Sequence, residues 1–111
     1  MYPSSKIDGI VVIKPKGILD ITNAYVFRDW VKKNFVENGE RIIAVDLSEL
    51  DSVDSFALGM FIALYKDTKL KGEKFFLVNP SKKVKRVIEI TSIDKIIPVV
   101  ESVSKIKEMV E

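Results

Sequence analysis

The sequence contains no cysteine and no histidine, and these two absences exclude several classes of function. Without cysteine the chain has no disulfide framework, no thiolate metal site and no thiol nucleophile. Without histidine it lacks the usual general base and the commonest metal ligand, which excludes the His-dependent hydrolytic triads. The remaining candidate nucleophiles are hydroxyl groups without an evident base. We therefore expect a protein that is not an enzyme, with no catalytic residues, no metal site and no cofactor.

Long hydrophobic runs are also missing from the sequence. No apolar stretch approaches the roughly 18–20 residues of a membrane-spanning helix, and the segment from Met1 to Ile10 lacks the basic and apolar regions of a secretion signal. The 18 basic and 16 acidic side chains give a net charge of +2, which is too even to predict nucleic-acid binding. We expect a cytoplasmic protein that contacts neither membranes nor nucleic acid directly.

The composition predicts one folded domain over residues 1–111. A chain of 111 residues is close to the usual size of a single domain. Hydrophobic residues make up 47% of it and charged residues 31%, so a continuous core can form beneath a solvated surface. The 5 glycines and 4 prolines are scattered and form no linker.

Apolar runs alternate with helical periods along the chain, which predicts an α/β fold. Strands are expected near residues 2–6, 10–13, 42–45, 75–78 and 96–99. Helices are expected near residues 24–35, 55–70, 79–91 and 102–109. Asp8-Gly9 is a typical two-residue hairpin turn, so the first two strands should be antiparallel. This order predicts a mostly parallel sheet of four to five strands with an antiparallel N-terminal strand and about four helices.

The most informative segment joins the third predicted strand to the second predicted helix. Residues 45–59 read VDLSELDSVDSFALG and resemble the strand, loop and helix-start signature of STAS domains, the family of bacterial anti-anti-sigma factors. Gly17-Ile18-Leu19-Asp20 is similar to the G-x-L-D segment that precedes the first helix in that family. Residues 80–97, which include Val84-Lys85-Arg86-Val87, are similar to a third family segment. The resemblance therefore spans nearly the whole chain.

The resemblance implies a regulatory binding protein. It places Ser55 at the family's phosphorylated serine, with Asp54 directly before it and Asp20 in a loop near that serine. The implied partners are an anti-sigma factor with serine kinase activity, which uses ATP and Mg²⁺, and a serine phosphatase. The unphosphorylated protein would bind the anti-sigma factor and free the sigma factor, and phosphorylation would reverse this. Taken together with the helix-face pattern described below, the expected partner-binding residues are Asp20, Asp54, Ser55, Phe56, Gly59 and Met60.

Two residues depart from the family pattern. Phe56 stands where the family usually has a small residue, and Ala57 stands where it usually has glycine. Both changes leave the expected fold intact. They make the surface beside Ser55 bulkier, and this bulk affects which kinase would accept Ser55 as a substrate.

The position of Ser55 favours phosphorylation on physical grounds as well. At a helix start its hydroxyl lies near backbone N–H groups that have no helical partner, and the helix dipole also favours a phosphate there. Phosphorylation would add about −1.5 to −2 charges beside Asp54 and repel an acidic or apolar partner without refolding. The alternative is that Asp54 and Ser55 serve only as capping residues.

The second predicted helix carries apolar residues on two sides. At about 100° per residue, one side forms the expected core stripe of Leu58, Phe61, Ile62 and Tyr65. Phe56, Met60 and Ala63 lie on roughly the opposite side. That second side is either an exposed docking patch for a partner or a surface covered by another helix or by the N-terminal strand.

Other interpretations remain open at this point. Asp46 ends a buried strand, as in a receiver-like domain phosphorylated on aspartate, but the acidic pair that receivers need after their first strand is missing. A nucleotide-binding α/β signalling domain would need a glycine-rich phosphate loop, and none is present. The basic cluster Lys82, Lys83, Lys85 and Arg86 is interpreted as a solvated helix face, with contact to an acidic partner as the alternative.

Overall fold

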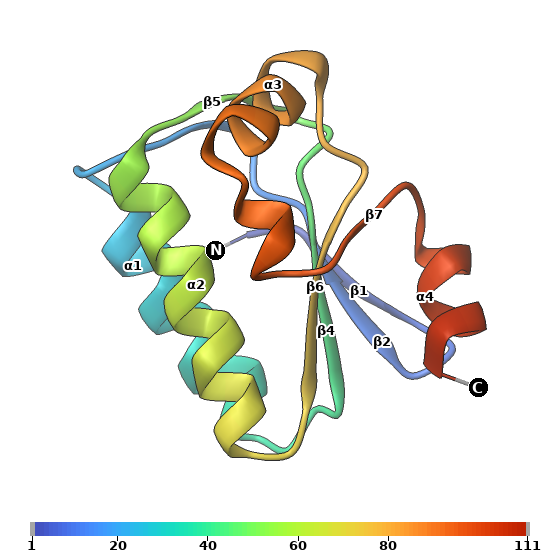
Figure 1. The fold of residues 1–111 in the computed structure, drawn as a ribbon. Helices are drawn as coiled ribbons and strands as arrows, with labels where there is room; N and C mark the ends of the chain where they lie inside the picture. The colour runs from blue at the N-terminus through green and yellow to red at the C-terminus, as the bar shows by residue number, and fades with distance from the viewer. Residues whose placement is uncertain (1, 111) are drawn as a thin grey trace.

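The computed structural model describes residues 2–110, so Met1 and Glu111 of the predicted domain lie outside the described residues. Its main sheet has five strands in the order β1, β2, β4, β6, β7. β1 is antiparallel to β2, and all other neighbours are parallel (Figure 1). The elements of this sheet and the four helices are β1 Ser4–Ile7, β2 Ile10–Ile13, β4 Ile42–Asp46, β6 Lys74–Val78, β7 Val99–Val100, α1 Ala24–Val31, α2 Ser55–Leu70, α3 Lys82–Thr91 and α4 Val103–Val110. The predicted α/β class and sheet arrangement are confirmed.

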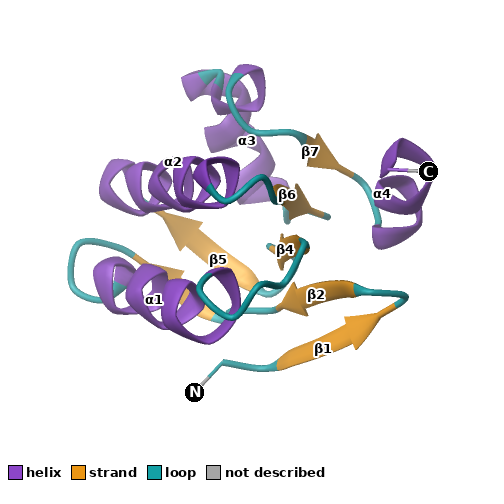
Figure 2. Cartoon of the chain, turned by 90° about the horizontal axis from the view of Figure 1, so that it is seen from below, coloured by secondary structure: helices purple, strands orange, loops and turns teal. Residues whose placement is uncertain are grey.

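The two faces of the sheet are covered unequally. On β2, Val11 and Ile13 pack into the core formed with α1, α2 and α3, whereas Ile10 and Val12 pack toward α4. Figure 2 shows α1 and α2 together on one side of the sheet and α4 alone on the other. All four side chains of β2 are therefore buried, which explains why the strand is a continuous apolar run.

The turn between β1 and β2 has the predicted hairpin geometry. Asp8 and Gly9 both have positive φ, 51° and 83°, as a two-residue type I′ turn requires. The Lys107 ammonium of α4 lies 2.9 Å from the Asp8 carboxylate. The same turn therefore ties α4 to the end of the sheet.

A second, two-stranded sheet was not predicted. β3 (Gly17–Leu19) pairs in parallel with β5 (Leu50–Val53). The strand pattern in the sequence was weak because β3 has only three residues and because β5 carries the exposed polar side chains of Asp51 and Ser52. Gly17 adopts a φ of 79° and its N–H donates to the Glu49 carbonyl over 3.1 Å, which starts the pairing. This small sheet carries the chain to the start of α2.

The last strand is shorter than predicted. β7 comprises only Val99–Val100, whereas a strand over residues 96–99 was expected. The chain before it forms a 3₁₀ turn over Ile93–Lys95, and Pro98 has no N–H to contribute to a ladder. The prediction for residues 96–98 was therefore wrong.

Candidate functional site

Ser55 is the first residue of α2, and its side chain is exposed. Its hydroxyl has no hydrogen-bond partner among residues 2–110. Asp54 is the residue that caps the helix, because its Oδ1 accepts a hydrogen bond from the Ala57 N–H over 2.8 Å. The capping alternative thus holds for Asp54 and not for Ser55, whose hydroxyl faces solvent.

Asp54 also joins the start of α2 to the loop between β3 and α1. Its Oδ2 accepts a hydrogen bond from the Ile21 N–H over 3.0 Å. Its own N–H donates to the Leu19 carbonyl over 3.3 Å. One side chain and its backbone therefore place the β3–α1 loop directly beside Ser55.

Asp20 lies in this loop and is held by its neighbours. Its Oδ1 accepts hydrogen bonds from the hydroxyl and from the N–H of Thr22. These two bonds lower the pKa of the Asp20 carboxyl, so the group carries a negative charge at neutral pH. The Asp20 N–H donates to Asn23 Oδ1 over 2.9 Å, which fixes the start of α1. The structure thus brings Asp20, Asp54 and Ser55 to one end of the molecule, as the family resemblance implied.

Phe56, Gly59, Met60 and Ala63 are half-buried. The side chains of Phe56 and Met60 pack against the main core, so they form neither a fully exposed docking patch nor part of the interior. In the expected core stripe, Leu58 and Phe61 are buried, whereas Ile62 and Tyr65 are only half-buried. Burial spreads around the helix because α2 contacts α1, β5 and β6 at once.

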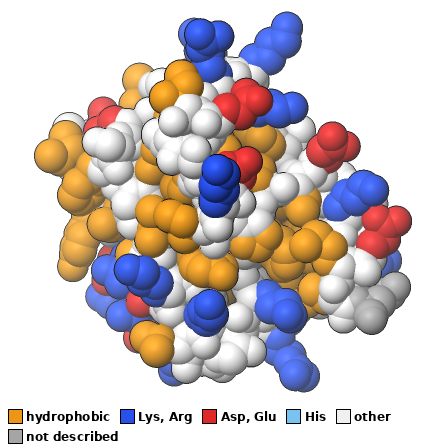
Figure 3. Space-filling model, in the orientation of Figure 1, with side chains coloured by type: hydrophobic (Ala, Val, Ile, Leu, Met, Phe, Trp, Pro, Cys, Tyr) orange, Lys and Arg blue, Asp and Glu red, His pale blue; other side chains and the backbone are white. Residues whose placement is uncertain are grey.

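An exposed apolar surface lies beside Ser55, and the sequence analysis did not single it out. It consists of Ile18 on β3, Ile21 in the following loop and Tyr25 on α1, with 53%, 69% and 58% of their surfaces exposed. We call these three residues the loop surface. In Figure 3 hydrophobic side chains gather along the left edge of the molecule, over the region where α1 and α2 begin in Figure 1. In the sequence, only the position of Tyr25 hinted at this surface, because Tyr25 falls outside the buried stripe of Ala24, Phe27 and Val31 on α1.

A family model of the STAS domain matches residues 3–106. This chain belongs to the STAS family. A Thermotoga maritima protein provisionally named an anti-sigma factor antagonist is 36% identical to this STAS domain over 110 residues, which are 99% of this chain and 97% of the relative. The crystal structure of a provisionally named anti-sigma factor antagonist from the same organism has a TM-score of 0.89 at 35% identity, covering 98% of this chain and 93% of the other.

A more distant likeness shows the fold alone. The structure of the Bacillus cell fate determinant SpoIIAA in the phosphorylated form has a TM-score of 0.70 at 16% identity and covers 100% of both chains. The family assignment agrees with the resemblance seen in residues 45–59 and favours it over the receiver-like and nucleotide-binding interpretations. Across residues 2–110, no helix of this STAS domain is long and apolar enough to span a membrane.

Proposed function

We propose that this STAS domain, residues 1–111, is an anti-sigma factor antagonist controlled by phosphorylation at Ser55. It binds an anti-sigma factor serine kinase, frees the sigma factor and catalyses no reaction itself. The name of the 36% identical Thermotoga maritima relative supports the coarser part of this proposal. The observation that carries the finer part is the exposed Ser55 hydroxyl at the start of α2, beside an apolar loop surface.

The start of α2 is suited to a phosphate. The Ala57 N–H is already taken by Asp54, but the N–H groups of Ser55 and Phe56 have no partner in the described part of the chain. The kinase transfers the γ-phosphoryl group of ATP to Ser55 Oγ, which releases ADP and the hydroxyl proton. The two free N–H groups and the positive end of the helix dipole then stabilise the phosphate. The helix therefore needs no rearrangement to carry the modification.

Phosphorylation acts on binding through charge. The phosphate adds about −1.5 to −2 charges next to the Asp54 carboxylate and near the ionised Asp20. A partner that covers the loop surface would have to bury this charge, and an unpaired buried charge costs more than a surface contact contributes. The partner is released, and a serine phosphatase restores binding by hydrolysing the phosphoester.

The proposed partner surface combines two groups of residues. Asp20, Asp54 and Ser55 supply the polar part, and the half-buried Phe56, Gly59 and Met60 supply the adjoining part of α2. Ile21 and Tyr25 of the loop surface supply exposed apolar area, which aromatic and aliphatic side chains provide in interface cores.

The test is a titration of each variant against the source organism's anti-sigma factor kinases with adenine nucleotide present, paired with a phosphorylation assay. Ser55→Ala is expected to bind like wild type and to take up no phosphate, whereas Ser55→Asp should bind weakly. The matched control is Ser52→Ala, which removes another exposed serine three residues earlier and should change neither readout. Undiminished phosphate incorporation into Ser55→Ala, or equal affinity for the phosphorylated and unphosphorylated wild type, would overturn the proposal.

A further inference from the structure

The first three residues of β6 lack a neighbouring strand on its outer side. β6 spans five residues, Lys74–Val78, but β7 pairs only with Leu77 and Val78. β7 is the last strand of the sheet order on that side. The outer edge of β6 is therefore open from residue 74 to residue 76, directly below β7 in Figure 1. We call this vacant strand position the β6 slot.

The hydrogen-bonding groups of Phe75 face the slot. The Lys74 N–H donates to the Arg41 carbonyl on the β4 side, whereas the Leu77 N–H donates to the Pro98 carbonyl on the β7 side. Because successive residues of a strand point their backbone groups to opposite neighbours, Phe75 points the same way as Leu77. A residue at 98 with an N–H would donate to the Phe75 carbonyl, but proline has none. Within the described residues, the N–H and C=O of Phe75 have no backbone partner.

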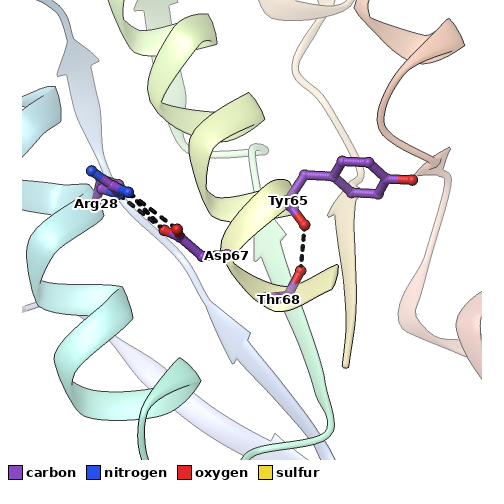
Figure 4. A network of polar contacts seen from close by, with 4 residues as sticks. All are labelled: Arg28, Tyr65, Asp67 and Thr68. Atoms are coloured by element: carbon purple, nitrogen blue, oxygen red, sulfur yellow. Dashed lines mark hydrogen bonds and ion pairs between the residues drawn. The ribbon is translucent and has the colours of Figure 1, made fainter. Parts of the chain in front are cut away.

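The slot has walls on both faces of the sheet. It is a groove of about 410 Å³ between Tyr65 and Lys69 of α2 on one side and Met109 and Val110 of α4 on the other, with Pro98 at its upper end. Figure 2 shows α2 and α4 on opposite sides of β6. In Figure 4 the Tyr65 ring points away from Asp67, toward the side on which the edge of β6 lies. The space therefore has the shape of one missing strand between two covering helices.

Glu73 provides a polar feature at the same place. Its side chain lines the groove, and its Oε1 is buried without a hydrogen-bond partner among the described residues. Burial raises the pKa of this carboxyl above its ordinary value. Lys71 acts on this carboxyl through its charge but donates no hydrogen bond to Oε1, so an N–H or ammonium donor that enters the groove would stabilise the buried oxygen.

We propose that the β6 slot binds an extended segment of a partner protein, with small aliphatic side chains and a lysine or arginine for Glu73, as a short added strand. One residue of an antiparallel segment exchanges both of its backbone hydrogen bonds with Phe75. A second copy of this chain cannot fill the slot through its own β6. Two-fold pairing about Phe75 would set Leu77 of one copy opposite Glu73 of the other, and Leu77 already carries β7 on that side.

This surface is separate from the proposed Ser55 site. Tyr65 lies ten residues along α2 from Ser55, which corresponds to about 15 Å of helix. The inference does not rest on the proposed function, because it uses only the edge of β6 and the groove beside it. A partner segment could occupy the slot in either phosphorylation state of Ser55.

The experiment uses the ¹⁵N-labelled protein and the probe acetyl-Lys-Val-Thr-Val-Lys-amide. Before addition, the Phe75 amide should exchange with solvent faster than the Leu77 amide, which is already bonded. The peptide should shift the Phe75 resonance and slow its exchange by about tenfold, while the Ser55 resonance stays in place. The matched control peptide is N-methylated at both valines and at the threonine, so none of its three central residues can donate an N–H to the Phe75 carbonyl.

Two variants complete the test. Pro98→Val supplies the missing N–H, so β7 should extend toward the slot and weaken the peptide's affinity roughly 2- to 10-fold. Glu73→Gln should lower the affinity for the lysine-containing peptide. It should leave unchanged the affinity for a peptide in which both lysines are replaced by glutamine. The proposal is overturned if the N-methylated peptide binds equally well, if the peptide leaves Phe75 exchange unchanged, or if resonance changes are confined to the Ser55 end.

Discussion

Arg28 of α1 and Asp67 of α2 form a forked ion pair that fixes the two helices relative to each other. Arg28 Nε lies 3.1 Å from Asp67 Oδ2, and Nη2 lies 2.9 Å from Oδ2 and 3.2 Å from Oδ1 (Figure 4). Their side chains are 23% and 13% exposed, so water screens the pair only in part. Because α1 carries Tyr25 and α2 begins at Ser55, this pair holds the two parts of the proposed partner surface in place.

The first prediction concerns this ion pair. Arg28→Met leaves the Asp67 carboxylate partly buried without its partner, so the free energy of unfolding should fall by about 1–3 kcal/mol. Urea denaturation measures the change. Lys33→Met is the control. Lys33 lies in the π-helical turn Lys32–Val36 that follows α1, and its exposed ion pair with Asp29 should contribute less than about 0.5 kcal/mol to stability. Equal losses of unfolding free energy in the two variants would show that the forked geometry adds no stability beyond that of an exposed ion pair.

The second prediction separates the capping residue Asp54 from the proposed phosphorylation site Ser55. Asp54→Ala removes the hydrogen bonds to the N–H groups of Ala57 and Ile21, so it should lower the free energy of unfolding by about 1–2 kcal/mol. Ser55→Ala removes an exposed hydroxyl without a partner and should change stability by less than about 0.5 kcal/mol. Thermal unfolding of both variants distinguishes the roles. A severe loss in Ser55→Ala would make Ser55 chiefly structural.

The third prediction concerns the apolar residues near Ser55. Ile21→Ser with Tyr25→Ser removes exposed side chains, so stability should hardly change while affinity for the anti-sigma factor kinase falls at least about tenfold. Phe56→Ser with Met60→Ser should also weaken binding, but it should cost about 1–3 kcal/mol of stability because both side chains pack on the core. Calorimetric titration and urea denaturation on the same samples test the two pairs. Unchanged affinity in the first pair would exclude the loop surface from the interface.

The fourth prediction concerns pH. The Thr22 hydroxyl is the main cause of the lowered Asp20 pKa, so Thr22→Val should raise that pKa toward its ordinary value. A carboxyl with a lowered folded-state pKa stabilises the fold fully above its unfolded pKa of about 3.9, and this contribution is lost as pH falls through the lower, folded value. The variant should therefore lose part of the acid-side pH dependence of stability.

An NMR titration of the Asp20 side-chain carboxyl checks this result directly. Thr91→Val is the matched control, because it also deletes a threonine hydroxyl that donates a hydrogen bond, in that case to the Val87 carbonyl on α3. It should leave the pKa of Asp20 unchanged. If Thr22→Val also leaves it unchanged, another group sets the acidity of Asp20.

The sequence predicts elements whose formation depends on local pattern. The apolar runs at residues 42–45 and 75–78 became β4 and β6, and the helix start at Ser55 was placed correctly. β3 and β5 could not be seen because each strand is stable only through pairing with the other, far away in the sequence. The residue pattern of a short segment does not indicate which distant segment it will pair with.

The sequence indicated where Asp20, Asp54 and Ser55 lie, but it did not indicate how far the apolar side chains around them are exposed. Asp54 and Ser55 follow from helix-start chemistry, and Asp20 followed from the family resemblance. The exposure of Ile21 and the half-burial of Phe56 depend on which neighbouring elements cover them, and only the folded arrangement decides that. Helical periodicity assigned two opposite faces to α2, but the helix is enclosed on more than one side.

The enclosure of α2 limits which of its residues can be substituted without disturbing the packing of the core. From Ser55 to Tyr65, only the side chain of Ser55 is exposed, so most substitutions on this stretch of α2 disturb packing. The β3–α1 loop has no such restriction, because Ile21 faces solvent while hydrogen bonds to the side chain and the N–H of Asp54 hold the loop in position. Substitutions in this loop can therefore change the surface beside Ser55 while the core and the start of α2 stay the same.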